Sequence, residues 1–528
     1  MTIKIHATGA AAAAVEQYVP GLVADYVASG ITAQDPALWG PDAEPEASIR
    51  LGWTEAVSIS RPLVAEIVAL RERFLSEGVE HFVLCGMGGS SLAPEVITKT
   101  YGVELTVLDS THPRQVADVL ADRLDRTVAI VASKSGSTAE TDSQKRAFEA
   151  AFTAAGIDPT TRIVVVTDPG SPLDQSARAD GYRVFNADPN VGGRYSALTA
   201  FGLVPSGLAG ADISELLDEA EAISLELALD AASNPGLVLG AAICGAGKSK
   251  LGIVSDGTHI VDFGDWVEQL IAESTGKLGK GILPVVLELD APELSEDLPD
   301  LQIVRLVGTY EDTRRVRDGE IEIAGTLGAQ LLTWEYATAV AGRILGINPF
   351  DQPDVESAKV AARALIDNLT PPAPPTFEDG TIGVSELGLA PATSLQEAID
   401  ALLASVPEDG YVAIQAYLDR AAHPEFAELR QVVAARTERP VTFGWGPRFL
   451  HSTGQFHKGG PAAGVFLQIL DGDAFDVEIP GRPFTFGQLI RAQAAGDASV
   501  LAEHGRPVLT LTFGSIRDDL PRLLAALA

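Results

Sequence analysis

The stretch Ser133-Lys134-Ser135-Gly136-Ser137-Thr138 decides the fold, because it joins two segments of different periodicity. The apolar, β-branched run Thr127-Val128-Ala129-Ile130-Val131-Ala132 precedes it and predicts a strand, whereas residues 139–154 show a helical pattern. The first N–H groups of a helix lack internal partners and carry partial positive charge. Hydroxyls, a lysine and a flexible glycine at such a turn therefore predict a binding site for a phosphate or a similar anion.

Composition narrows the class of protein. A chain of 528 residues is too long for one hydrophobic core and predicts two to four domains. The net charge of −34 argues against nucleic acids and anionic membranes as partners. No apolar run reaches the ~18 residues of a membrane span. The alanine run at 10–14, followed by Glu16, predicts an N-terminal helix rather than a signal peptide.

The two cysteines, Cys85 and Cys244, provide no disulfide framework and favour a reducing, cytoplasmic location. Neither cysteine has metal-ligand spacing around it, so we expect no metal site.

Short apolar strands alternate with longer helical patterns, which predicts an α/β fold with parallel sheets flanked by helices. The near-continuous hydrophobicity of the first strands is typical of a sheet covered on both faces. Three series of strands are expected, at 82–85, 105–108, 128–132, 163–167 and 183–185, then 251–255, 285–289 and 303–307, then 411–415, 465–470 and 508–513.

A proline-rich stretch at 369–376 separates the last series from the others, because four prolines there cannot continue a helix. We therefore expect a helical N-terminal segment (1–45), a first α/β domain with the phosphate loop (46–230), a second α/β domain (231–370) and a C-terminal α/β unit (377–528).

Two glycine-rich turns have two possible readings each. Gly86-Met87-Gly88-Gly89-Ser90-Ser91 follows the first strand and is either a plain tight turn or a place where the backbone approaches a ligand. Asn190-Val191-Gly192-Gly193-Arg194-Tyr195-Ser196 carries either a surface arginine or a permanent cation placed against developing negative charge.

Two helices carry charged candidates. The helical pattern from residue 266 ends at Gly276, a probable C-cap, so Glu273 lies in its last turn as a solvated side chain or as a general base. A second helix begins after Asp351-Gln352-Pro353, with Asp351 as its N-cap. Lys359 lies near the positive end of that helix, where either an anionic ligand or a pair with Glu356 would explain it.

The loop Leu450-His451-Ser452-Thr453-Gly454-Gln455-Phe456-His457-Lys458-Gly459-Gly460-Pro461 is the densest polar loop of the third series. Its two histidines titrate near neutrality and are either structural or functional. A metal site would need further ligands, and the nearby sequence offers none.

Taken in order, these motifs resemble those of the glucose-6-phosphate isomerase family, whose members contain two sugar-isomerase (SIS) domains. The resemblance covers most of residues 46–370. It implies reversible isomerisation of glucose 6-phosphate to fructose 6-phosphate in glycolysis and gluconeogenesis, without metal or organic cofactor, by a homodimer. The five motifs are 86–91, 133–138 with Glu140-Thr141 behind it, 192–196, 273–277 and 351–359.

The same resemblance implies a role for each motif. Glu273 would move the proton between C2 and C1 through a cis-enediolate that Arg194 stabilises. Gln352 and Lys359 would contact the sugar, with Lys359 assisting ring opening. The phosphate would be held by Gly89, Ser90, Ser133, Lys134, Ser135 and Thr138.

One family feature has no counterpart at its usual place. The ring-opening histidine usually comes from a loop between the base and the final helix, but residues 308–350 contain no histidine. We expect the 450–461 loop to supply it, since this loop resembles the C-terminal part of long bacterial isomerases, some of which are fused to transaldolase. His457 is favoured as the catalytic histidine because it adjoins the Gly459-Gly460 turn, and His451 is expected among the substrate-binding residues.

Two alternatives stay open. A non-catalytic, sugar-phosphate-binding regulator made of SIS domains would keep the 133–138 loop but would need neither Glu273 nor Lys359. An isomerase with dual specificity for glucose and mannose phosphates is also possible, since C2 epimers differ by one hydroxyl.

Overall fold

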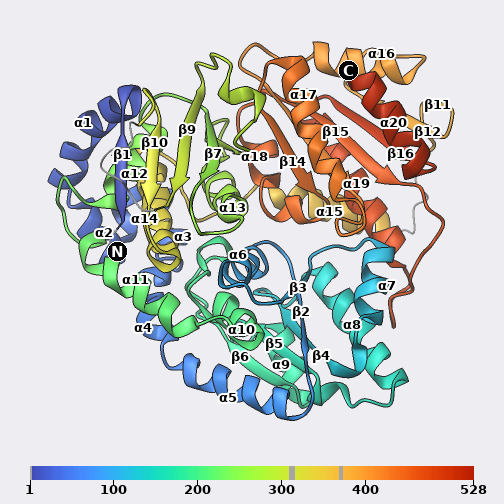
Figure 1. Cartoon of the computed structure of the whole chain (residues 1–528), viewed down its shortest axis with the longest axis horizontal. Coiled ribbons are helices and arrows are strands. Elements are labelled where there is room, and N and C mark those ends of the chain that lie inside the picture. The colour runs from blue at the N-terminus through green and yellow to red at the C-terminus, as the bar shows by residue number, and fades with distance from the viewer. Residues whose placement is uncertain (1–2, 309–315, 368–372) are drawn as a thin grey trace.

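The computed structural model describes residues 3–308, 316–367 and 373–528. Three mainly parallel sheets, each flanked by helices, form three lobes around a common centre (Figure 1). The α/β fold predicted from the alternation of strands and helices is therefore confirmed.

The first sheet shows why its strands are almost wholly apolar. All six residues of β4 (Thr127–Ala132) are buried. From Val128 onward, successive residues belong alternately to two hydrophobic clusters. Val128 and Ile130 pack in one cluster with Phe201 of α10, whereas Ala129 and Val131 pack in another with Phe148 of α8. Helices thus cover both faces. The strand order is β3 (Thr106–Leu108), β2 (His81–Gly86), β4 (Thr127–Ala132), β5 (Ile163–Thr167) and β6 (Arg183–Asn186), all parallel, with α5 (Leu63–Ser76), α7 (Pro113–Ala121), α8 (Ala139–Ala154), α9 (Pro172–Ala179) and α10 (Ala200–Ala209) beside it.

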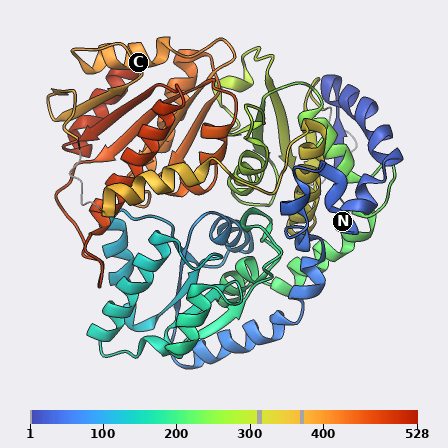
Figure 2. The same ribbon diagram turned by 180° about the vertical axis from the view of Figure 1, so that it is seen from behind.

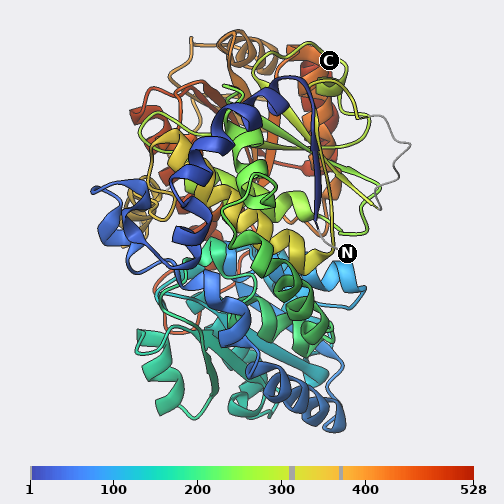
Figure 3. The same ribbon diagram turned by 90° about the vertical axis from the view of Figure 1, so that its left-hand side faces the viewer.

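The second sheet contains a strand that the sequence did not predict. Lys4–Ala7 forms β1, which pairs antiparallel with β10 (Figure 3), so the segment 1–45 is not wholly helical as expected. A four-residue edge strand is too short to show a clear period of two. The order is β1, β10 (Ile321–Ala324), β9 (Leu301–Val307), β7 (Lys250–Asp256) and β8 (Leu283–Leu287), flanked by α1 (Gly9–Ala24), α11 (Ile213–Leu227), α12 (Pro235–Cys244), α13 (Phe263–Thr275) and α14 (Leu327–Leu345).

The third sheet is mixed. Four strands, from β16 through β15 and β13 to the edge strand β14, are parallel, whereas β12 pairs antiparallel with both β16 and β11. The domain limits inferred from the sequence stay predictions, and residues 368–372 of the proline-rich spacer lie outside the described residues. The order is β11 (Phe377–Asp379), β12 (Ile382–Leu387), β16 (Val508–Phe513), β15 (Gly464–Asp471), β13 (Tyr411–Tyr417) and β14 (Val441–Trp445), with α16 (Leu395–Ala404), α17 (Leu429–Thr437), α19 (Phe486–Glu503) and α20 (Ile516–Leu527).

Five helices lie where the lobes meet. α13 of the second lobe contacts α6 (Leu92–Tyr101) of the first lobe and the short α18 (Gly454–Gly459) of the third. α15 (Val355–Asp367) packs along α19, as the view from behind shows (Figure 2). Segments far apart in the sequence therefore converge beside the last turn of α13.

Buried ion pairs join the third lobe to the first. Arg448, in the short helix η9 (Arg448–His451), donates through Nη1 to Glu95 of α6 and, over 2.6 Å, to Asp109 Oδ2. Arg420 donates to Glu95 Oε1 over 3.2 Å. Removing one partner would leave a buried charge uncompensated, so these pairs fix the position of η9.

Among the described residues, no helix combines the length and the hydropathy that crossing a bilayer requires.

Candidate active site

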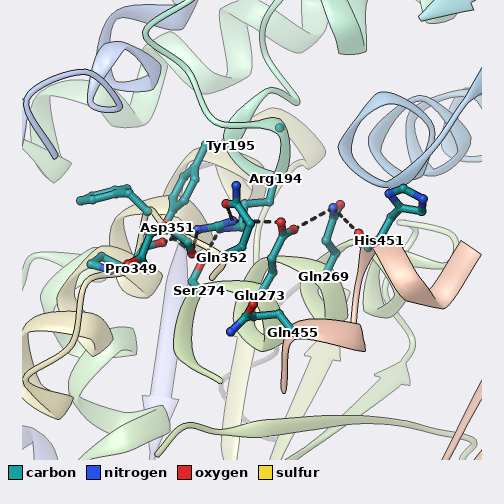
Figure 4. Close-up of polar contacts among 12 residues, drawn as sticks. Arg194, Tyr195, Gln269, Glu273, Ser274, Pro349, Asp351, Gln352, His451 and Gln455 are labelled. Atoms are coloured by element: carbon teal, nitrogen blue, oxygen red, sulfur yellow. Dashed lines mark hydrogen bonds and ion pairs between the residues drawn. The ribbon is translucent and has the colours of Figure 1, made fainter. Parts of the chain in front are cut away.

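Arg194 lies at the centre of the converging segments. It belongs to the short helix η6 (Gly193–Tyr195), and its side chain is 2% exposed. Its Nε donates to Ser274 Oγ over 2.9 Å, and its Nη1 lies 3.1 Å from Glu273 Oε1 (Figure 4). The guanidinium thus lies against the last turn of α13, and the surface reading of this arginine is wrong.

The other donors of Arg194 hold the segment before α15. Nη1 donates to Gln352 Oε1 over 2.9 Å, and Nη2 donates to the carbonyls of Pro349 and Asp351 over 2.8 and 3.0 Å. The structure therefore brings Gln352 to Arg194, while the sugar contact that the resemblance implies for Gln352 stays a prediction. Protein groups fix the plane of the guanidinium before any ligand arrives.

Glu273 occupies the last turn of α13, which ends at Gly276 as predicted. Its side chain is 15% exposed, so the carboxylate is accessible but mostly enclosed. Gln269, one turn earlier, donates through Nε2 to Glu273 Oε2 over 3.1 Å and to the carbonyl of His451 over 2.8 Å. Figure 4 shows Arg194, Glu273, Gln269 and His451 joined in one row.

Lys277, two residues after the end of α13, holds the segment that precedes α15. Its ammonium donates to the carbonyl and to Oδ1 of Asp351, both over 2.6 Å. Burial and the neighbouring charge of Arg194 lower the pKa of Lys277 to about 8, although Asp351 opposes the shift. The position of Asp351, and with it the segment held by Arg194, therefore depends on a lysine that titrates near neutrality.

The glycines of the 86–91 turn allow three segments to meet. A Cβ at Gly89 would lie 2.0 Å from the carbonyl oxygen of Gly193, beside Arg194. A Cβ at Gly88, whose φ is +56°, would lie 2.7 Å from the carbonyl oxygen of His451. This turn is thus a point of close approach between backbones, and it places Ser90, which is 9% exposed, at the same edge of the sheet.

The 133–138 loop lies between β4 and α8, as predicted. Ser133 Oγ donates to Thr138 Oγ1 over 3.1 Å, and the hydroxyls of Ser135 and Ser137 lie 3.0 Å apart. These hydroxyls bond to one another beside the N-terminus of a 16-residue helix, where an anion would find donors.

Lys134 differs from its neighbours in the loop, because its ammonium already has a partner. It donates to Asp168 Oδ2 over 2.5 Å. Burial lowers the pKa of Lys134 and raises that of Asp168, although each opposes the shift of the other. A phosphate would have to compete with Asp168 for this lysine.

The structure brings His451 to the site. Its Nε2 lies 2.9 Å from Glu140 Oε1, and its side chain is 16% exposed. Glu140 is in the first turn of α8, directly behind the 133–138 loop. Burial opposes ionisation of Glu140, but the charge and hydrogen bond of His451, with a contribution from Lys359, lower its pKa overall. Glu140 is therefore a buried carboxylate aimed at His451.

The structure does not bring His457 to this cluster, contrary to our expectation. His457 is on α18 and 2% exposed, and its Nδ1 lies 2.9 Å from the hydroxyl of Tyr411. Its ring stacks on that of Tyr411 and packs edge-on against Phe466. Burial, with the charges of Lys458 and Arg506, lowers its pKa well below the usual range. His457 therefore faces the core and not the cluster around Arg194.

Lys359 is at the open side of the site. Its side chain is 48% exposed, and its Nζ lies 3.8 Å from Glu356 Oε2, the pairing that the sequence offered as one explanation. Its charge nevertheless contributes to lowering the pKa of Glu140.

Sequence reasoning missed Gln269 and Gln455. Gln269 is four residues before Glu273 on the same helix face, so helical spacing could have indicated it. Gln455 Nε2 donates to the carbonyl of Gly276 over 2.8 Å and to Asp354 Oδ2 over 2.6 Å, contacts that span 179 and 101 residues. No local pattern could have predicted those.

Within the described ranges, no three histidine, cysteine, aspartate or glutamate side chains are grouped so that they could bind a metal ion.

Comparison with known proteins assigns the family. The phosphoglucose isomerase profile matches residues 73–277. A probable glucose-6-phosphate isomerase of Haloarcula marismortui is 31% identical over 342 residues, covering 54% of this chain and 78% of that protein. A glucose-6-phosphate isomerase of Rubrobacter xylanophilus is 30% identical over 364 residues, covering 54% and 83%. The chain belongs to the phosphoglucose isomerase family.

Solved structures share the fold of this family member. A hypothetical protein of Thermus thermophilus superposes with a TM-score of 0.58 at 23% identity, covering 70% of this chain and 100% of that one. A glucose-6-phosphate isomerase of Chlamydia trachomatis gives a TM-score of 0.51 at 20% identity, covering 61% and 79%.

The profile of the phosphoglucose isomerase family ends at residue 277. It includes the 133–138 loop, Arg194 and Glu273, whereas Lys359 and His451 lie beyond it. The contact with Glu140, rather than the profile, connects His451 to the site.

Proposed function

We propose that this chain interconverts glucose 6-phosphate and fructose 6-phosphate by proton transfer through a cis-enediolate. The observation that carries the proposal is the buried Arg194 guanidinium 3.1 Å from the partly exposed carboxylate of Glu273. Family membership and the anion site at the N-terminus of α8 support the same substrate class.

Phosphate binding orients the sugar. The N-terminus of α8 supplies backbone donors, and the hydroxyls of Ser133, Ser135 and Thr138 can turn from one another toward phosphate oxygens. Ser90 reaches the same edge of the sheet from the neighbouring strand. Lys134 joins these donors if it leaves Asp168. Binding at this end places C1 and C2 near Glu273, so the energy of the phosphate contacts serves orientation.

Proton transfer then follows from the contacts of Glu273. Its carboxylate removes the proton from C2 of the open-chain aldose, and the electron pair of that C–H bond forms the enediolate. Negative charge leaves the carboxylate and appears on the enediolate oxygens while Arg194 stays beside both. A proton passes from O2 to O1 of the enediolate, and Glu273 returns its own proton to C1, so that the electron pair closes to the C2 carbonyl of the ketose.

Ring opening is assigned to His451 rather than to His457. His451 is partly exposed and is paired with the carboxylate of Glu140, which stabilises its protonated form. An imidazolium at this point can donate a proton to the ring oxygen as the C1–O5 bond breaks, and the neutral ring can regain a proton from the C1 hydroxyl, which becomes the aldehyde. Lys359, which is exposed, supplies a second cation for the sugar, and Gln352 contacts it beside Arg194.

All of these residues come from one chain. The homodimer implied by the resemblance stays a prediction. The net charge of −34 supports the absence of nucleic-acid and anionic-membrane partners, and the two buried, unbridged cysteines support a cytoplasmic location.

A coupled assay with fructose 6-phosphate tests the proposal, repeated with mannose 6-phosphate to detect dual specificity. We expect turnover of fructose 6-phosphate that survives a strong chelator. Glu273→Gln should abolish turnover but retain binding of the sugar phosphate. Glu72→Gln, at an exposed position on α5, is the control and should leave turnover unchanged. Binding without turnover by the unaltered chain would instead favour the sugar-phosphate-binding regulator.

A further inference from the structure

A glutamine of the third lobe contacts the carboxylate behind the catalytic histidine. Gln493, on α19, is 6% exposed, and its Nε2 donates to Glu140 Oε1 over 2.7 Å. The two residues are 353 positions apart in the sequence. The same carboxylate oxygen lies 2.9 Å from Nε2 of His451. One oxygen of Glu140 therefore accepts a hydrogen bond from Gln493 and also contacts the ring nitrogen of His451.

A second contact fixes which end of the amide faces Glu140. Thr111, which is fully buried, donates from Oγ1 to Gln493 Oε1 over 2.9 Å. Because the ionised carboxylate of Glu140 can only accept, the NH₂ group faces it, and the Thr111 hydroxyl, which can donate, keeps the amide oxygen on its own side. Thr111, Gln493, Glu140 and His451 thus form a directed chain of hydrogen bonds.

The charges around Glu140 show what the glutamine adds. His451 from η9 and Lys359 from α15 are the charged groups whose fields lower its pKa, whereas α19 presents the neutral amide of Gln493. When His451 is protonated, its charge compensates the carboxylate. When His451 has given up its proton, Glu140 is a buried anion beside a neutral ring, and the amide donor then matters most.

We propose that Gln493 is a positioning residue for ring opening, holding Glu140 ionised and aimed at His451 while the histidine donates and regains its proton. This inference rests on the proposed function. It gives the third lobe a second role besides providing His451, because Gln493 on α19 stabilises Glu140, the carboxylate that pairs with His451.

Gln493→Leu removes both polar contacts and keeps a similar volume. We expect kcat for glucose 6-phosphate to fall about tenfold with KM within about twofold, the loss typical of one hydrogen bond to a charged group. The alkaline limit of the activity profile should move to higher pH, because the state with an ionised Glu140 beside a neutral histidine loses its donor.

Ring opening can be measured apart from isomerisation. In a Glu273→Gln background, exchange between the anomers of glucose 6-phosphate, followed by NMR, reports ring opening alone. Adding Gln493→Leu to that background should slow the exchange by the same factor of about ten.

Gln493→Glu distinguishes positioning from packing. Two carboxyl groups in contact cannot both ionise readily, so the introduced group stays protonated at low pH and donates its O–H to Glu140. At about pH 6, the activity of this variant should be near that of the unaltered chain. By about pH 9 it should be about tenfold lower than at pH 6, because the introduced group ionises. A purely structural role would not give this dependence.

Gln468→Leu is the matched control, since Gln468 is a buried glutamine of the same lobe that bonds to Gln415 on β13. Equal losses of thermal stability in both leucine variants, with kcat and pH profile unchanged, would overturn the inference. If His451→Gln loses activity but Gln493→Leu is fully active, the role of Gln493 is overturned and the proposed function is left intact. An unaltered chain that does not turn over fructose 6-phosphate would overturn both.

Discussion

The two ends of the proposed site differ in how their polar groups are satisfied. At the reaction end, every nitrogen of the Arg194 guanidinium donates to a protein group, and Gln269 ties Glu273 to the His451 segment. At the phosphate end, the hydroxyls of the 133–138 loop form hydrogen bonds with other residues of the same loop. The reaction end is therefore built in advance, whereas the phosphate end must exchange partners when it binds a ligand.

This difference predicts where substitutions act. A change at the reaction end should lower kcat, because stabilisation there is needed mainly in the transition state. A change at the phosphate end should raise KM, because those contacts are made in the ground state as well.

Arg194→Met should give the largest effect. It removes the cation next to the developing enediolate and leaves the Pro349 and Asp351 carbonyls without their donor. We expect kcat to fall at least about 10³-fold, measured in the coupled assay. Arg420→Met, which removes a partly buried arginine of the third lobe's ion-pair cluster, controls for loss of an arginine as such. A kcat loss of less than tenfold for Arg194→Met would contradict preorganisation.

The two histidines should respond in opposite ways. His451→Gln should lower kcat about 10²-fold, the usual contribution of one acid–base group. His457→Gln should change kcat by less than about threefold but lower the free energy of unfolding by about 1–3 kcal/mol, because Tyr411 loses a buried partner. Calorimetry and kinetics on the same preparations measure both. The reverse pattern would return the catalytic role to His457.

Ser133→Ala and Thr138→Val test the phosphate end. Each should raise KM for fructose 6-phosphate about tenfold and change kcat by less than about twofold. Ser137→Ala is the control within the same loop, since the resemblance gives Ser137 no phosphate contact. A fall in kcat with unchanged KM would show that the loop, like the reaction end, acts mainly in the transition state.

Raising the pH should have the smallest effect. Lys277 has a pKa of about 8 in the folded chain against a usual 10.5, so it loses its proton and its hold on Asp351 as the pH rises through about 8. We expect kcat/KM to fall about fourfold between about pH 7 and 8.5 from this group. Lys277→Arg keeps the charge and should move the fall to higher pH.

Stability should not follow the same course. Because the folded pKa of Lys277 lies below the unfolded one, the unfolded chain binds the extra proton between about pH 8 and 10.5. The destabilising contribution of Lys277 is therefore relieved as the pH rises through that window. A melting temperature that falls in parallel with activity would contradict Lys277 as the cause.

Local features of this molecule were predictable from the sequence. The strand, turn and helix across 127–154 and the end of α13 at Gly276 depend on residues close together in the chain. The same holds for the strands of the first sheet, where continuous burial gives a clear signal.

Features that depend on distant contacts were not predictable. β1 is a strand because Lys4 pairs with Ala324. His451 and His457 are six residues apart in one polar loop, and only the packing of α18 against Tyr411 shows which one faces the core. Gln493 reaches Glu140 across 353 residues, with no motif around it.

The most direct test of the central claim follows the proton that Glu273 is proposed to move. In D₂O, the unaltered chain should incorporate solvent deuterium into C1 of fructose 6-phosphate and C2 of glucose 6-phosphate, observed by NMR. Glu273→Gln should incorporate none while it still exchanges the anomers of glucose 6-phosphate. Deuterium incorporation by Glu273→Gln at a rate near that of the unaltered chain would show that another group is the base.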